Sequence, residues 1–82
     1  MYDRKKILPD LGRMCKEYRT YIGVTQSDVA RATGYSEQNI SSFETGRTNN
    51  MILLLWYIDQ GIFSNTNKNM KYRLHRLLRG GE

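Results

Sequence analysis

The chain has 82 residues, enough for a single domain that buries roughly 60 % of its unfolded surface. Its hydrophobic content of 39 % and aromatic content of 11 % argue against a disordered coil, and the single cysteine, Cys15, excludes an intrachain disulfide framework. The net charge of +5 favours an anionic partner, while the longest apolar run, residues 51–58, is too short for a membrane span. The N-terminus does not resemble a secretory signal, so we expect one cytoplasmic domain over residues 1–82.

The first predicted helix follows an apolar stripe with helical spacing. The stripe consists of Leu11, Met14, Cys15, Tyr18 and Ile22. Pro9 and Asp10 suit the first turn and the N-cap, and Gly23 suits the left-handed position that follows a helix. The pattern therefore predicts a helix that begins near residue 10 and ends before Gly23.

Two short helices separated by a glycine turn are predicted between residues 25 and 46. Thr25 is a suitable N-cap for the first, and Asp28 three residues later gives an imperfect capping box. Ser36 is a suitable N-cap for the second, with Asn39 where a capping box favours Glu or Gln. Two short capped helices joined by a tight turn, in a small basic helical chain, are typical of a helix-turn-helix.

Two more helices are predicted in the second half of the chain. Asn49 and Asn50 offer an N-cap for a helix that runs to Gln60. The last helix lies within residues 63–82, a basic segment with a net charge of +4. One face of that helix carries Met70, Leu74, Leu77 and Leu78. No segment has a strand pattern, so the predicted fold class is all-α with five helices.

The helix-turn-helix residues resemble those of the Cro/C1-type repressors of phages, also called the xenobiotic-response-element family. The resemblance covers residues 11–62, which we take as the helix-turn-helix core. The matching positions are Leu11, Gly12, Cys15, Tyr18, Arg19, residues 23–26, Val29, Ala30, residues 34–36, Ile40, Ser41, Phe43, Glu44 and Gly46. The resemblance implies a compact lambda-repressor-like domain that binds a palindromic double-stranded DNA operator as a homodimer. We therefore predict a sequence-specific transcriptional regulator, and a repressor rather than an activator.

The helix that starts after Ser36 has a polar outer face suited to reading bases. Its outward residues are Glu37, Gln38, Ser41 and Ser42, whereas Ile40 and Phe43 point inward. A helix of this kind fits a major groove about 12 Å wide, where Gln38 could pair with adenine and Glu37 could accept from cytosine. Periodicity alone leaves open a merely solvated polar face; the resemblance implies base contact.

The resemblance also implies contacts with the DNA backbone. Gln26 follows the Thr25 cap, where the helix N-terminus favours a phosphate. The predicted backbone contacts are Gln26, Ser36, Asn39, Arg47, Thr48, Asn49 and Arg19. Arg19 and Glu44 resemble the internal ion pair that ties the first helix to the recognition helix, with two unrelated surface charges as the alternative. Asn50 departs from the family, which often has proline near this position.

The predicted fourth helix has more apolar residues than one core-facing stripe requires. Ile52, Leu55, Ile58 and Ile62 fall where the family keeps its last core residues. The surplus residues, together with those of the last helix, form the predicted dimer interface: Leu53, Leu54, Trp56, Tyr57, Met70, Leu74 and Leu78. The surplus face could be covered by the fifth helix, by a second protomer or by both.

No catalytic or metal constellation is apparent in the sequence. Cys15 and His75 are isolated candidates and do not make a site, so we expect no enzyme activity, no cofactor and no metal. The alternative function is a protein-interaction module, an antitoxin or adaptor that binds an antirepressor or toxin protein; the net charge of −2 over residues 21–62 favours it. General nucleoid or RNA binding through the basic tail lacks the aromatic platform expected for single strands.

Overall fold

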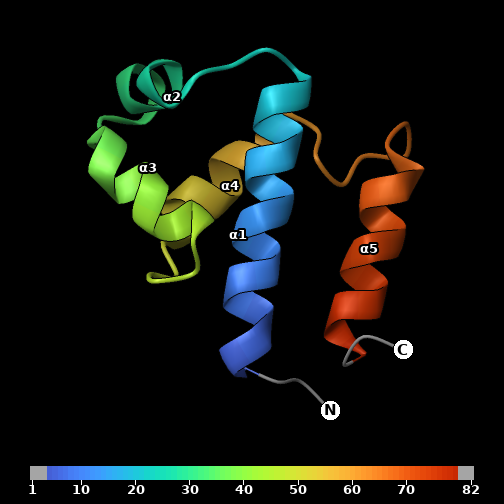
Figure 1. Ribbon diagram of the computed structural model, residues 1–82. Helices are drawn as coiled ribbons and strands as arrows, with labels where there is room; N and C mark the ends of the chain where they lie inside the picture. Colours follow the sequence, from blue (N-terminus) through green and yellow to red (C-terminus); the bar gives the residue numbers. More distant parts are fainter. Residues whose placement is uncertain (1–3, 80–82) are drawn as a thin grey trace.

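The computed structural model describes residues 4–79 and consists of five helices around one core (Figure 1). The helices are α1 (Arg4–Tyr21), α2 (Gln26–Thr33), α3 (Glu37–Glu44), α4 (Met51–Asp59) and α5 (Lys68–Leu78). Residues 4–79 contain no strand, so the predicted all-α class is confirmed. The outer ends of the predicted domain, residues 1–3 and 80–82, lie outside the described residues.

Both short helices of the helix-turn-helix begin with a complete capping box. The Thr25 hydroxyl accepts the Asp28 N–H at 3.1 Å, and the Asp28 carboxylate accepts the Thr25 N–H at 2.9 Å. At α3, the Ser36 hydroxyl accepts the Asn39 N–H at 3.1 Å, and the Asn39 side-chain oxygen accepts the Ser36 N–H at 3.2 Å. Asp and Asn therefore complete the reciprocal pattern that Glu or Gln usually completes. Gly34 ends α2 with a φ of +81°, and the turn into α3 follows.

Helix α1 begins earlier than the sequence pattern predicts. It starts at Arg4, and Pro9 lies inside it rather than in its first turn. Proline lacks an N–H, and Pro9 is the sixth residue of the helix, so α1 lacks the one ladder bond that this N–H would donate. Ile7 extends the apolar stripe by one turn and packs against the core. Because α1 begins at Arg4, the prediction that the helix begins near residue 10 is wrong.

A close approach between α1 and α3 depends on Gly12. A Cβ atom at this position would lie 2.5 Å from the carbonyl oxygens of both Phe43 and Glu44. Gly46, just after α3, is similarly close to the backbone of Pro9. The two glycines therefore let the C-terminal end of α3 rest on the side of α1.

The core contains residues from all five helices and the segment after α4. Its buried apolar residues are Met14, Cys15, Tyr18, Val29, Ile40, Phe43, Leu53, Tyr57, Ile62, Met70 and Leu77. Helix α1 lies between α3 and α5, with α4 packed behind it (Figure 1). Because Met70 and Leu77 of α5 are part of this core, α5 is an integral element of the fold and more than a basic tail.

The core-facing side of α4 differs from the one predicted. Ile52, Leu55 and Ile58 are 54 %, 54 % and 45 % exposed, whereas Leu53 and Tyr57 are fully buried. The expectation that the first three lie in the core is therefore wrong, and Ile62 alone of the four is confirmed there. Leu53 and Tyr57 were predicted in the dimer interface, but their side chains have no exposed surface, so this part of the prediction is wrong. On this core-facing side, the Tyr57 hydroxyl donates to Glu44.

Helix α5 packs along α1 on the side opposite α3. Met70 and Leu77 are buried, Leu74 and Leu78 are half-buried, and Arg73 pairs with Glu17 of α1 at 2.6 Å. The fifth helix thus covers part of the apolar surface that the sequence assigned to a dimer. Within residues 4–79, none of the helices is both long and apolar enough to cross a bilayer.

Candidate nucleic-acid interface

Helix α3 lies at the edge of the molecule (Figure 1), and its exposed side chains are polar. Glu37, Gln38 and Ser41 are exposed there, and Ser42 is half-buried. Ile40 on the opposite side is fully buried in the core. The structure therefore brings three of the four predicted base-reading residues onto an open surface, with Ser42 at its margin.

Ser36 and Asn39 lie at the N-terminus of α3, next to this face. Their side chains are exposed, and the Ser36 hydroxyl and the Asn39 side-chain oxygen are 2.9 Å apart. Both side chains are engaged in the capping box. The structure therefore gives these two residues a defined role in starting α3.

The Glu44 carboxylate at the end of α3 joins three other helices, and we call these contacts the Glu44 hub. Arg19 of α1 donates from Nε to Oε2 at 2.8 Å and from Nη2 to Oε1 at 3.1 Å. Gln26 of α2 donates from Nε2 to Oε1 at 3.2 Å, and the Tyr57 hydroxyl of α4 donates to Oε2. Arg19 also donates from Nη1 to the Val24 carbonyl at 2.9 Å. The expected ion pair is present, but sequence reasoning missed Gln26 and Tyr57 as its partners.

The hub is electrostatically consistent with an ionised carboxylate. Burial by itself would raise the pKa of Glu44, but the hydrogen bonds from Arg19, Tyr57 and Gln26 outweigh it and lower that pKa below its ordinary value. The bond to Glu44 also raises the pKa of Arg19. Burial, followed by the Glu44 charge, raises the pKa of Cys15 to about 12, so this thiol stays protonated. Within residues 4–79, every buried side-chain nitrogen and oxygen has a hydrogen-bond partner.

A hollow of about 540 Å³ opens where the end of α1 meets the start of α2. Its lining residues are Arg19, Thr20, Gly23, Val24, Thr25, Gln26, Ser27 and Glu37. The first N–H groups of α2 lie beside it, and the first N–H groups of a helix have no intrahelical acceptor. Since Glu37 begins α3, the hollow and the outer face of α3 belong to one continuous surface.

The loop after α3 continues from the C-terminal end of that helix. Its exposed residues are Arg47, Thr48 and Asn49. Gly46 holds the start of the loop against Pro9 of α1, with a φ of +81°. At its end, the Asn50 side chain accepts the Leu53 N–H at 3.1 Å and caps α4. The Asn50 side chain therefore stabilises the start of α4 as an N-cap.

Comparison with known proteins agrees with this geometry. The family described as a helix-turn-helix domain matches residues 10–50, half of the chain, a range that includes α2, α3 and the α1 residues Gly12 and Arg19 that contact α3. No curated protein and no solved structure matches the chain. The match supports DNA as the partner and regulation as the role. The chain belongs to the helix-turn-helix domain family.

Proposed function

We propose that the protein is a Cro/C1-type regulator that represses transcription by occupying a palindromic operator as a homodimer. The observation that carries the proposal is the exposed polar face of α3, whose far end is fixed by the buried Glu44 hub. Reading a groove requires side chains that reach the base edges and a backbone that holds them in place. Repression requires only that the operator is occupied, so the interface itself is sufficient for it.

The proposed base contacts follow from the chemistry of the exposed side chains. The Gln38 amide can both donate and accept, which matches N7 and N6 of adenine in the major groove. The Glu37 carboxylate can accept from the N4 amine of cytosine, and its charge disfavours a position beside a phosphate. Ser41 and the half-buried Ser42 can donate to or accept from several bases.

The proposed backbone contacts surround the hollow between α1 and α2. Arg19 donates two hydrogen bonds to Glu44 and one to the Val24 carbonyl, and it lines this hollow. A phosphate seated there would meet the N-terminus of α2 at Gln26 as well as the guanidinium. The loop residues Arg47, Thr48 and Asn49, with Ser36 and Asn39 at the start of α3, are the further backbone contacts that we propose.

Self-association is proposed through the exposed apolar face of α4, which we call the α4 stripe. It consists of Met51, Ile52, Leu55 and Ile58, which are between 45 % and 70 % exposed. An apolar patch of this kind marks an interaction surface. A second copy of the chain is the proposed occupant, because a two-fold axis pairs the stripe with itself and needs no opposite charge. Half-buried Leu54 and Trp56 flank this face.

A second copy also lengthens the DNA sequence that the protein can recognise. One recognition helix reads only a few base pairs, too few to be unique among the roughly 10⁶ or more competing sites in a genome. Two α3 helices about 34 Å apart would read two half-sites one helical turn apart. The test is selection of bound duplexes from a random pool, followed by sequencing. An enriched inverted repeat with that spacing supports the proposal, and a pool without enrichment contradicts it.

The second candidate is a protein-interaction module, favoured by the same α4 stripe. In this case Leu55 and its neighbours would contact an antirepressor or toxin protein instead of a second copy. The chain would then sediment as a monomer and select no sequence from the random pool. Dimerisation together with sequence enrichment would exclude this function.

A further inference from the structure

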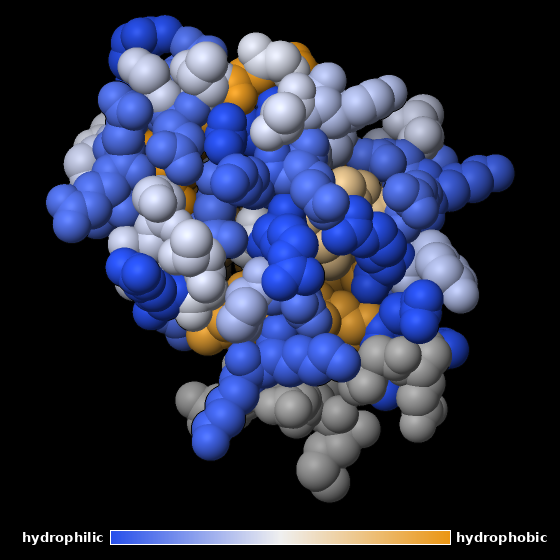
Figure 2. Space-filling model, in the orientation of Figure 1, coloured by the Kyte–Doolittle hydropathy of each residue, from blue (hydrophilic) through white to orange (hydrophobic). Residues whose placement is uncertain are grey.

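The side of α5 that faces away from α1 carries cations and no carboxylate. Residues 60–81 contain neither Asp nor Glu. In Figure 2, which has the orientation of Figure 1, hydrophilic side chains protrude along the edge of the molecule where α5 lies. Four exposed residues at helical spacing, with the half-buried Lys71 beside them, form what we call the α5 basic face: Lys68, Lys71, Tyr72, His75 and Arg79.

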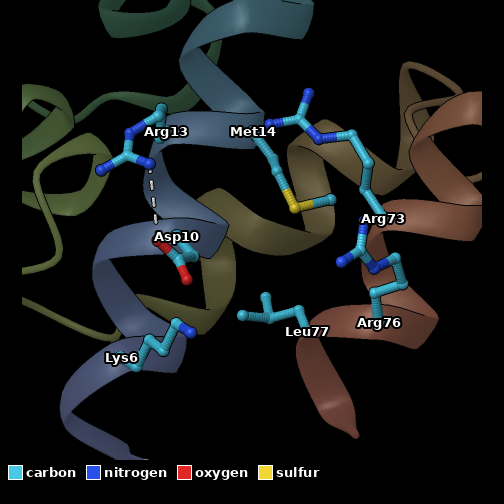
Figure 3. Close-up of a pocket in the computed structure, with 7 residues that line it drawn as sticks. All are labelled: Lys6, Asp10, Arg13, Met14, Arg73, Arg76 and Leu77. Carbon is cyan, nitrogen blue, oxygen red and sulfur yellow. Dashed lines mark ion pairs between the residues drawn. The ribbon is translucent and has the colours of Figure 1, made fainter. Parts of the chain in front are cut away.

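The opposite side of α5 is occupied by its packing on α1. Met70 and Leu77 are buried in the core. Leu77 of α5 and Met14 of α1 point into the space between the two helices (Figure 3). Arg73 adds a charged contact, with its Nη2 2.6 Å from Oε2 of Glu17. Helix α5 is therefore held on α1 by apolar and charged contacts, and it presents the α5 basic face outward.

The cations of this face have no acidic partner in the described part of the chain. Within residues 4–79, neither Lys68 nor Arg79 forms an ion pair. Lys71 donates from Nζ to the side-chain oxygen of Asn65 at 2.9 Å, a neutral acceptor that leaves its charge uncompensated. The face therefore offers three positive charges to an anionic partner.

The phosphate backbone of a DNA duplex matches the charge and length of this face. Each strand carries one phosphate per 3.4 Å of duplex axis, and Lys and Arg bind these phosphates without reading sequence. Lys68 and Arg79 are 11 residues apart. At 1.5 Å per residue they are about 16 Å apart along the helix, which corresponds to roughly five phosphates of one strand.

Other anionic partners match the α5 basic face less well. A helix that binds a lipid surface inserts an apolar face, but the apolar face of α5 is buried in the core. The centre of a protein interface is rich in aromatic residues and poor in lysine, which is the reverse of this face. Single strands require an aromatic platform, and Tyr72, the one aromatic residue of the face, already has the Arg76 guanidinium 5.9 Å from its ring centre. A duplex backbone requires no such platform.

The α5 basic face is separate from the exposed face of α3. Gly12 of α1 lies against the end of α3, whereas Glu17 of the same helix pairs with Arg73 of α5. Helix α1 lies between α3 and α5 (Figure 1). A duplex on the outer face of α3 would therefore leave the α5 basic face accessible.

We infer that the α5 basic face binds the phosphate backbone of a second DNA duplex without reading its sequence, with Lys68, Lys71 and Arg79 on the phosphates. One molecule would then hold two DNA segments together, one on α3 and one on α5. The contact at α5 depends on charge alone, so it does not require that α3 reads base pairs.

The first measurement isolates binding at α5. Gln38→Glu/Ser41→Glu adds two carboxylates to the exposed face of α3 and should repel a duplex from it, while α5 is unchanged. Fluorescence anisotropy with a labelled duplex of arbitrary sequence should show residual binding that weakens with salt. Adding Lys68→Gln/Arg79→Gln should lower the slope of log affinity against log salt concentration by about 1.8, because each lost phosphate contact contributes about 0.9.

A charge-matched variant is the control. Arg13→Gln/Lys16→Gln removes the same charge from exposed positions of α1 and should leave the slope unchanged. Equal falls in slope for the two pairs, or no residual binding after the change to α3, would overturn the inference. Polyglutamate that displaces the duplex at an equal concentration of charge would indicate a general polyanion surface and would also overturn it. If a variant does not fold, as judged by circular dichroism, duplex-induced amide NMR shifts of the parent chain decide: shifts in residues 68–79 support the inference, and their absence overturns it.

The second measurement tests bridging. The chain is bound to an immobilised duplex, and capture of a labelled second duplex is recorded. We expect the parent chain to capture it, and Lys68→Gln/Arg79→Gln to lose most of the capture while the amount of chain on the first duplex is kept. Capture that survives this variant would assign bridging to the two α3 helices of a dimer and would overturn the bridging role of α5.

Discussion

Arg19 and Glu44 are 25 residues apart in the sequence, yet Nε of the arginine donates to Oε2 of the glutamate at 2.8 Å. Their side chains are only 10 % and 1 % exposed. A buried pair adds little net stability, but an unpaired buried charge costs several kcal/mol. The relationship therefore fixes where the end of α3 lies on α1, because any displacement of α3 would leave both charges without a partner.

The first prediction concerns loss of this pairing. Glu44→Gln should lower the free energy of unfolding by about 3–5 kcal/mol, because the Arg19 guanidinium stays buried without its counter-charge. The control is Glu17→Gln, which breaks the more exposed pair with Arg73 and should cost about 0–1 kcal/mol. Urea denaturation followed by circular dichroism measures both. Equal small effects would show that the hub does not hold α3.

The second prediction concerns the stability of the folded chain at acidic pH. The pKa of Glu44 is lower in the folded chain than its ordinary value of 4.5, so the unfolded chain binds the proton more tightly. Its contribution to stability is therefore complete above about pH 4.5 and is lost as the pH falls through the lower folded pKa. Glu44→Gln should show a smaller fall in urea midpoint between neutral and acidic pH than the parent chain. A parallel fall in both would assign the acid sensitivity to other carboxylates.

The third prediction concerns Gly12, where alanine should have the opposite of its usual effect on helix stability. Gly→Ala inside a helix normally stabilises it by about 0.5–1 kcal/mol. Gly12→Ala should instead destabilise the chain by about 1–3 kcal/mol, because the new Cβ would overlap the backbone oxygens at the end of α3. Thermal unfolding measures the effect. Thr20→Ala, at an exposed position of the same helix, is the control and should change stability by no more than about 0.5 kcal/mol. A stabilising Gly12→Ala would contradict the close α1–α3 contact.

The fourth prediction tests the α4 stripe. Leu55→Asn should convert a dimer to a monomer in sedimentation and weaken operator binding, while its helical circular dichroism is retained, because Leu55 is 54 % exposed. Tyr72→Asn is the matched control, since it removes an exposed apolar side chain from α5 and should leave the dimer intact. A dimer that survives Leu55→Asn would place the interface elsewhere.

A change at the buried Tyr57 should act differently. Tyr57→Phe should lower the free energy of unfolding, because it removes the buried hydroxyl that donates to Glu44.

The local structure around the recognition helix was predictable because its causes are local. The contacts that start α2 and α3 join Thr25 to Asp28 and Ser36 to Asn39, each three residues apart. Sequence alone therefore identified both helices and the turn between them. The early start of α1 was missed because burial of Ile7 outweighed the signal of Pro9.

The parts that depend on distant contacts were not predictable in the same way. All eight residues of 51–58 are apolar or aromatic, so hydrophobic periodicity does not distinguish the buried face of α4 from its exposed face. Tyr57 is the residue that could have indicated the buried face, because a buried tyrosine hydroxyl needs a hydrogen-bond partner. Here that partner is Glu44, 13 residues away. The contact of α5 with α1 likewise pairs Arg73 with Glu17, which are 56 positions apart. The buried state of Met70 and Leu77 likewise means that truncation after Gly61 would damage the core instead of removing only basic charge.

The central claim, that α3 reads base pairs, is tested most directly at Gln38. Binding of the parent chain and of Gln38→Ala should be measured by fluorescence anisotropy on the selected operator and on operators changed at single base pairs. Gln38→Ala should lose about 1–3 kcal/mol on the operator and lose its preference at one base pair in each half-site, because the bidentate contact with adenine is gone. A uniform loss on every duplex, with all base preferences kept, would contradict the claim and make Gln38 a contact of the DNA backbone.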